Sequence, residues 1–393
     1  MPEPMRVAIA YDCLYPVHTG GGERVYRRMA ELFVERGNHV TYVTRSDWAT
    51  DAAPHAPFDI AGVWRGDIYD PGGTRTTSSA VGFAFGLFRH FVRRRHSYDL
   101  VVVAALPVLN VFAARFALLG SGTVLAVDWL EVWSWRKWRG YAGAVTGTIA
   151  WLLQSAAVHV GRIVTVNSGF TARRLRGYRR RVDPLVLGLV DLASDEPLAT
   201  TVAPKAPAVL FVGRHIADKR VDAIPAALAH ARTTVPHLRA FIAGSGPETD
   251  AVRRAAGAAG IANEVHLLGR IDDAELRRRY REASVLVNPS AREGFGLVVA
   301  EAAAAATPSV VVAGEDNAAA ELVVDGVNGE VAADASPRVL GDAIARVVLA
   351  GEPMRRSTLA WFEQARSEHG LARSVDELLA RAAALRAGRR RRG

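Results

Sequence analysis

The chain has 393 residues, half of them apolar, which suits two domains of roughly 180 residues each better than one core. Its single cysteine, Cys13, excludes an internal disulfide framework and fits a reducing compartment. The formal net charge is +9, and residues 1–195 alone carry 23 Lys and Arg against 16 Asp and Glu. Nucleic acid, anionic lipid and phosphorylated substrates are therefore all candidate partners.

The chain begins with a pattern that predicts a strand, a glycine-rich loop, a helix and a second strand. The first strand is expected at 6–11, the helix ends at Gly37, and the second strand is expected at 39–44. The loop contains three consecutive glycines, Gly20, Gly21 and Gly22, without the spaced pattern of nicotinamide-binding loops. The backbone of this loop could approach a phosphate or a sugar, or it could simply form a tight turn.

Residues 50–79 are rich in Pro, Gly, Asp and Thr and are expected to be irregular. The following segment, 81–95, combines four phenylalanines with a basic cluster. It fits either an interfacial membrane helix or a core helix whose cations favour its C-terminus, and we favour the core helix. The longest apolar region, 100–120, is interrupted by Pro107 and Arg115, so a buried strand and a helix are expected rather than a membrane span.

A strand expected at 123–127 leads into a segment with four tryptophans in ten residues. Within it, Asp128, Trp129, Glu131 and Trp133 indicate a cleft wall, because aromatic faces stack on sugar rings and carboxylates accept hydrogen bonds from hydroxyls. A patch that faces lipid, or that only packs, is the alternative. Another strand is expected at 163–166.

After a polar linker at 194–207, a second alternating series of strands and helices begins at Val209. Three loops follow strands of this series and should meet at one edge of a parallel sheet. The first contains Arg214 and Lys219, a cationic pair that suits a diphosphate. The second is a glycine loop at 243–248, and the third is 288–301, where a helix expected from Leu297 offers free amides to an anion.

These motifs together resemble the family-four (group 1) retaining glycosyltransferases of the GT-B fold. The resemblance rests on Gly213-Arg214 with Lys219, on 243–248, on Glu293-Gly-Phe-Gly-Leu with Glu301, and on 325–329. It implies an α/β protein of two Rossmann-like, doubly wound domains that face each other across a cleft. The implied boundaries are an acceptor domain at 1–193, a donor domain at 194–360, and at 361–393 a helix that crosses back to the first domain, with a basic tail.

The resemblance also assigns roles to individual residues. Arg214 and Lys219 would hold the diphosphate, Glu301 the ribose and Glu293 the transferred sugar, and Asp128 would complete the catalytic group. The remaining implied donor contacts come from glycine loops, the base-facing segment and the helix start: Gly20, Gly21, Gly22, Gly213, Gly244, Gly246, Ile271, Gly294, Phe295, Gly296, Leu297 and Val298. Trp129, Glu131 and Trp133 would contact the acceptor. Many relatives carry a histidine where this chain has Asp128, so either Asp128 or Glu131 stands in for it.

The implied reaction is transfer of a hexose-type sugar from a nucleotide-diphosphate sugar to a glycan, lipid-linked or small-molecule acceptor, with retention of configuration. No cofactor and no metal are expected, since the cations would replace the ion. The expected location is cytoplasmic, with an anionic membrane surface as a further candidate partner. Alternatives are an epimerase or phosphorylase of the same fold, or a basic protein that binds nucleic acid or membranes without catalysis. No nucleic-acid-binding module is recognised.

Overall fold

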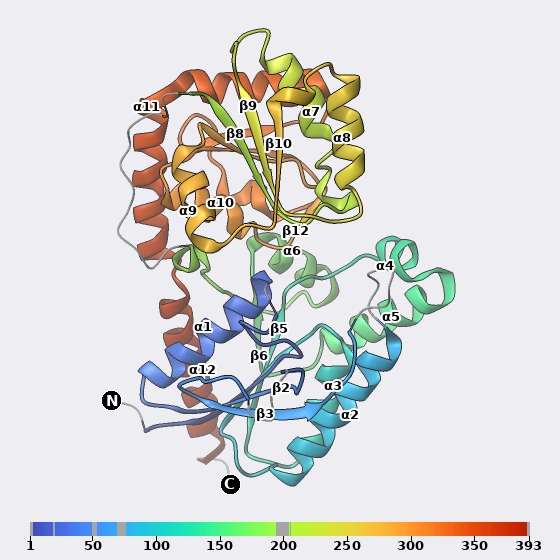
Figure 1. Cartoon of the computed structure of the whole chain (residues 1–393). Helices are drawn as coiled ribbons and strands as arrows, with labels where there is room; N and C mark the ends of the chain where they lie inside the picture. The colour runs from blue at the N-terminus through green and yellow to red at the C-terminus, as the bar shows by residue number, and fades with distance from the viewer. Residues whose placement is uncertain are drawn as a thin grey trace. The chain divides into compact units, whose positions relative to one another are not determined.

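The computed structural model describes residues 3–18, 20–48, 53–68, 76–193, 204 and 206–390. The chain forms two compact domains, a first made of Met1–Gly188 and Leu371–Gly393, and a second made of Leu189–Gly370 (Figure 1). Most of the expected linker at 194–207 and the end of the basic tail lie outside the described residues. Two parallel-sheet α/β domains are present, as the sequence predicted.

The first domain is built on a sheet of seven parallel strands. In spatial order they are β3 (Asp59–Trp64), β2 (His39–Arg45), β1 (Arg6–Ala10), β4 (Leu100–Ala104), β5 (Val124–Trp129), β6 (Ile163–Val166) and β7 (Leu185–Val186). The central strands are apolar on both faces because helices cover both. Strand β3 lies inside the segment expected to be irregular. It is an edge strand that is only partly buried, so it lacks the apolar run that marks the others.

Helices cover both faces of this sheet (Figure 1). The helices of this domain are α1 (Gly21–Glu35), α2 (Thr77–Arg93), α3 (Leu109–Ala117), α4 (Trp135–Ala142), α5 (Ala144–Ala157), α6 (Gly169–Tyr178) and α12 (Leu371–Arg390). Of these, α4 buries no residue and packs against α5. Helices α1 and α12 pack together on one side. Helices α2, α3, α5 and α6 bury apolar side chains in a single core cluster on the other. No helix in the described part of the chain combines the length and apolarity that a membrane span requires.

The second domain has a sheet of six parallel strands, in which the chain order of the strands reverses between the two middle strands. The order is β10 (Val265–Gly269), β9 (Arg239–Ala243), β8 (Ala208–Val212), β11 (Val285–Asn288), β13 (Ser309–Val312) and β15 (Gly329–Ala332). Its helices are α7 (Ala223–Ala231), α8 (Thr249–Ala258), α9 (Asp273–Glu282), α10 (Leu297–Ala304) and α11 (Pro337–Glu368). Successive strands run outward from β8 in one direction and from β11 in the other. A doubly wound sheet binds ligands at such a switch point, outside the carboxyl ends of its strands.

The segment expected to form the returning helix, 361–393, is shared between the two domains. Trp361 belongs to α11 and packs against core residues of the second domain. The helix that packs in the first domain is α12, which begins at Leu371 and contacts α1, β5, β6 and β7.

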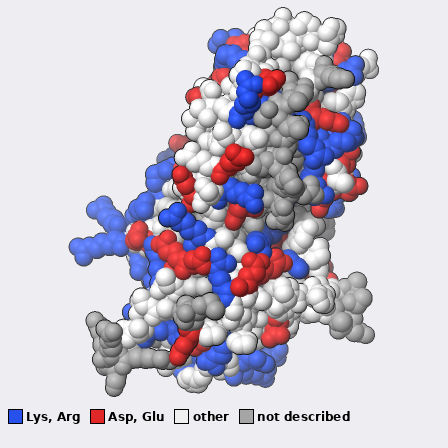
Figure 2. All heavy atoms as spheres, turned by 90° about the vertical axis from the view of Figure 1, so that its left-hand side faces the viewer, with Lys and Arg blue, Asp and Glu red and all other residues white. Residues whose placement is uncertain are grey.

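Charges of both signs are interspersed over the described surface shown in Figure 2. In the first domain, α12 contributes ion pairs to this pattern. Asp376 pairs with Arg36 of α1, and Arg381 pairs with Glu377 of its own helix.

Candidate functional site

A connected group of polar side chains lies at the switch point of the second sheet, between β8 and β11. Strands β8 and β11 are adjacent there, and the loops that follow them are joined. The Ala291 amide donates to the Asp218 carbonyl at 2.8 Å, and Arg292 Nη2 lies 2.9 Å from Asp218 Oδ2. The two loops therefore form one connected edge.

Lys219 from the β8 loop and Glu293 from the β11 loop form an ion pair across this edge. Their side chains are 21% and 13% exposed, so the pair is largely screened from solvent without being sealed off. The residues are 74 positions apart in the sequence. The prediction that the β8 and β11 loops meet is thus confirmed for this pair. Arg214, two residues after β8, is exposed.

Three further residues, none of which was assigned a role from the sequence, hold Glu293 in place. Asn288 Nδ2 donates to Glu293 Oε1 at 3.3 Å, and Ser290 Oγ lies 3.2 Å from the same oxygen. A short parallel pairing of β12 (Arg292–Glu293) with β14 (Asp316–Asn317) sets Glu293 opposite Asn317. Asn317 Nδ2 donates to the Ser290 carbonyl at 3.1 Å. The only signal in the sequence was the cluster of small polar residues beside Glu293.

Helix α10 begins directly after this loop, with its N-terminus at the same edge. Gly296 precedes it with φ of +96°, and an added Cβ would lie 2.5 Å from Cβ of Ala319. Both features require glycine there, and glycine brings no capping side chain to the helix amides. Of the other predicted residues here, Gly294, Leu297 and Val298 are half-buried, and Phe295 packs against the core.

Glu301 lies one turn inside α10, where Tyr280 of α9 donates to its Oε2 at 2.7 Å. Ile271 is half-buried just beyond the end of β10, on the same edge of the sheet. The structure therefore brings the second-domain donor residues to the carboxyl ends of the strands.

The predicted glycines 213, 244 and 246 have a packing reason as well as a predicted ligand contact. A Cβ on Gly244 would lie 1.8 Å from the Gly213 carbonyl oxygen, and one on Gly246 would lie 2.3 Å from that of His215. His215 is fully buried with Nδ1 2.8 Å from Thr249 Oγ1, and burial lowers its pKa. The neutral imidazole thus helps to lock the β8 and β9 loops together.

In the first domain, Gly20 caps the N-terminus of α1, and Gly21 and Gly22 are the first two residues of that helix. An added Cβ on Gly22 would lie 3.0 Å from the Tyr11 hydroxyl, so the loop is closely packed. The carboxylate of Glu23 occupies the space that a side chain on residue 20 would need. The loop sits at the carboxyl end of β1, as predicted.

Asp128, at the end of β5, is fully buried. Tyr26 donates to its Oδ2 and Thr165 donates to its Oδ1, each at 2.5 Å. Burial raises the pKa of the carboxyl group, against the two hydrogen bonds that lower it. Both oxygens are engaged inside the domain, so Asp128 ties β5 to α1 and β6, and this placement favours a positioning role.

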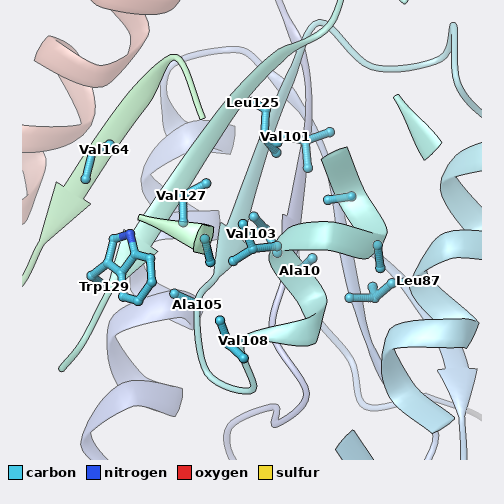
Figure 3. Close-up of a cluster of buried hydrophobic side chains, with 14 of the residues drawn as sticks. Ala10, Leu87, Val101, Val103, Ala105, Val108, Leu125, Val127, Trp129 and Val164 are labelled. Carbon is cyan, nitrogen blue, oxygen red and sulfur yellow. The ribbon is translucent and has the colours of Figure 1, made fainter. Parts of the chain in front are cut away.

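The tryptophans around Glu131 mostly pack inside the first domain. Trp129 is 1% exposed and belongs to the core beneath α2, α3 and α5 (Figure 3). Trp133 is buried against Trp138, with ring centroids 4.7 Å apart, and its Nε1 donates to Glu131. The packing alternative therefore accounts for Trp129 and Trp133, while Glu131 stays half-buried at the surface.

Several solved structures share this architecture. Sucrose-phosphate synthase from Thermosynechococcus elongatus superimposes with a TM-score of 0.77 over 97% of this chain and 99% of that chain, at 18% identity. HepE from Anabaena, in complex with UDP and glucose, gives a TM-score of 0.69 over 97% and 100% of the chains, at 17% identity. The fold is therefore GT-B, with two Rossmann-like domains.

Residues 197–360, which lie in the second domain, match the family described as "Glycosyl transferases group 1". A D-inositol 3-phosphate glycosyltransferase of Catenulispora acidiphila is 33% identical over 47% of this chain and 42% of its own length. A GDP-mannose-dependent phosphatidylinositol monomannoside mannosyltransferase of Mycolicibacterium smegmatis is 33% identical over 35% and 39%. The match to the group 1 glycosyltransferase family thus covers the second domain, and the chain's matches span less than half the length of these relatives.

Proposed function

We propose that this protein transfers a hexose-type sugar from a nucleoside-diphosphate sugar to a hydroxyl acceptor, with retention of configuration and without a metal ion. The observation that carries the proposal is the Lys219–Glu293 pair at the switch point, beside the N-terminus of α10. A cation, a carboxylate and free helix amides on one edge match the three parts of such a donor.

The diphosphate would lie between Arg214, Lys219 and the first amides of α10. Breaking the glycosyl–phosphate bond leaves a nucleoside-diphosphate anion, and these donors stabilise charge where it develops. Arg214 is exposed and can form a bidentate contact, while Lys219 supplies a point charge. These two cations would neutralise the charge of the departing diphosphate, as a divalent ion does in metal-dependent enzymes. We propose metal independence for this reason.

The transferred sugar would bind at Glu293. Among the described residues, Lys219, Asn288 and Ser290 all contact its Oε1, which leaves Oε2 to accept from sugar hydroxyls. Glu301, fixed by Tyr280, would accept from the ribose. Glu293 is oriented as a hydrogen-bond acceptor, and the acceptor hydroxyl would attack from the face that the diphosphate leaves.

The acceptor would bind to the first domain near Glu131. Many relatives carry a histidine at the position of Asp128. Both oxygens of Asp128 accept hydrogen bonds in the interior, whereas Glu131 is half-buried at the surface, so we assign the role of that histidine to Glu131. The relatives named above act on a phosphorylated inositol and on a mannosylated phosphatidylinositol, which supports a polyol or glycan acceptor.

A thermal-shift series tests the donor site directly. The purified protein is heated with UDP, GDP, ADP and their glucose and mannose conjugates in the presence of EDTA. A nucleotide at 100 times its Kd stabilises the protein by about 2.7 kcal/mol, which raises Tm measurably. We expect one base to stand out and its sugar conjugate to be consumed only when an acceptor is added.

The matched control is Arg346→Ala, which removes a cation paired with Glu330 on the surface of the same domain. Lys219→Ala should reduce the shift with the preferred nucleotide, and Arg346→Ala should not. If no nucleotide shifts Tm, or if turnover appears only with added Mg²⁺, the proposed donor site or its metal independence is wrong. Anomeric configuration of the product, read by NMR, separates retention from inversion.

A further inference from the structure

Helix α2 carries apolar residues on its outer side as well as on the side that reaches the core. Phe83, Leu87 and Phe91 are fully buried against the first sheet. On the opposite side, Phe85 is 66% exposed. A solvent-facing helix normally carries polar residues on its outer face, so this outer stripe needs another explanation. Its members recur at helical spacing: Val81, Phe85, Phe88 and Val92.

Two neighbouring helices expose apolar residues in the same way. Helix α3, which packs against α2, exposes Phe116 by 59%, followed by Leu119 by 46%. Helix α5, which contacts α3, exposes a stripe spaced by four and three residues: Val145 at 73%, Ile149 at 52% and Leu152 at 55%. All three helices cover one side of the first sheet (Figure 1). We call the outward surface of these three helices the α2–α3–α5 face. Scattered exposed apolar residues are ordinary, but aligned stripes on adjacent helices mark an interaction surface.

The segment that contains these three helices is mostly positive in charge. Residues 76–182 contain 15 Lys and Arg and only three Asp and Glu. Of these carboxylates, Asp99 and Asp128 are buried and Glu131 is half-buried against Trp133. Exposed cations on α2, α3 and α4, or just beyond these helices, include Arg89, Arg93, Arg94, Arg115, Arg136 and Arg139. The surface in Figure 2, by contrast, mixes both signs.

We propose that the α2–α3–α5 face docks on an anionic lipid surface. The apolar stripes would enter the boundary between headgroups and acyl chains, while the arginines would contact anionic headgroups. A second copy of the chain fits less well, because a two-fold interface through this face would set arginines against arginines. A lipid surface needs no matching shape and supplies the missing negative charge. The proposal concerns the first domain alone and does not depend on the transferase activity.

Vesicle flotation of the full-length protein tests the proposal. The probes are vesicles of phosphatidylcholine alone and vesicles in which about 40% of it is replaced by anionic phosphatidylglycerol, which gives the surface the negative potential that attracts basic segments. The first variant, Phe85→Ser/Phe116→Ser/Ile149→Ser, removes one exposed apolar residue from each helix. The second, Arg89→Ser/Arg93→Ser, removes two cations from α2. Circular dichroism melting confirms that each variant folds.

The matched control is Leu349→Ser, at a residue 64% exposed in the second domain. We expect the wild type and the control to float with the anionic vesicles. The apolar variant should bind at least tenfold more weakly, and the arginine variant should lose most of its preference for anionic lipid. If the wild type does not bind these vesicles, or if the folded apolar variant binds equally well, the proposal is wrong. Sedimentation that shows a dimer, lost in the apolar variant, would assign the face to a second copy instead.

Discussion

Replacing Lys219 by alanine separates a catalytic role of the Lys219–Glu293 pair from a purely structural one. The change removes the ammonium group that faces Glu293 and leaves the loop backbone intact. In the proposed reaction this cation stabilises the departing diphosphate. Loss of one preorganised donor to a developing negative charge lowers kcat by about 10²–10³-fold, or about 2.7–4 kcal/mol. We expect a loss in that range for Lys219→Ala with saturating donor.

The effect on folding should be much smaller. Glu293 keeps Asn288 and Ser290 as partners, and both members of the ion pair retain some exposure. The stabilising effect of the pair is therefore discounted for solvent screening, to about 1 kcal/mol of unfolding free energy. A fall in activity of two orders of magnitude cannot then be attributed to unfolding.

The assay follows release of nucleoside diphosphate at fixed enzyme concentration, with Tm measured on the same samples. Arg346→Ala, which breaks a surface pair in the same domain, should stay within about twofold of wild type, as surface changes usually do. If Lys219→Ala keeps kcat within threefold of wild type while its melting is unchanged, the assigned role of Lys219 is refuted.

Two further predictions concern stability. Burial and the nearby Arg94 lower the pKa of His90 from 6.5 to about 4, so the folded state binds this proton less tightly than the unfolded chain. Stability is therefore lost as pH falls from about 6.5 toward 4, and urea titrations should show a smaller loss for His90→Gln than for wild type. Gly244→Ala places a Cβ 1.8 Å from the Gly213 carbonyl at a φ of +123° and should lower the unfolding free energy by about 2–4 kcal/mol. Gly257→Ala, in α8 with open space around it, should be neutral or stabilising by up to about 1 kcal/mol; equal melting of the two variants would contradict the packing argument.

Much of the fold could be predicted because its signals are local. Short apolar runs, such as the one at 285–287, produced strands close to their expected ends, and glycine loops marked the carboxyl edge of the second sheet. The edge strand β3 escaped prediction because partial burial leaves no continuous apolar run. The returning helix was expected to begin at Trp361. Trp361 instead packs against the core of the second domain, and the helix that packs in the first domain begins at Leu371.

The sequence by itself determined which segments could become strands, helices and loops, because backbone preference and apolar spacing act over a few residues. It also determined the chemical types at the site, including Lys219 and Glu293. Only the tertiary structure decided what each side chain faces. It buried Asp128 between Tyr26 and Thr165, and it left Phe85 exposed on a helix that buries Phe83 and Phe91 in the core. The physical reason is that burial depends on which distant segments pack together, and apolar residues on all sides of a helix give no indication of which side will be covered.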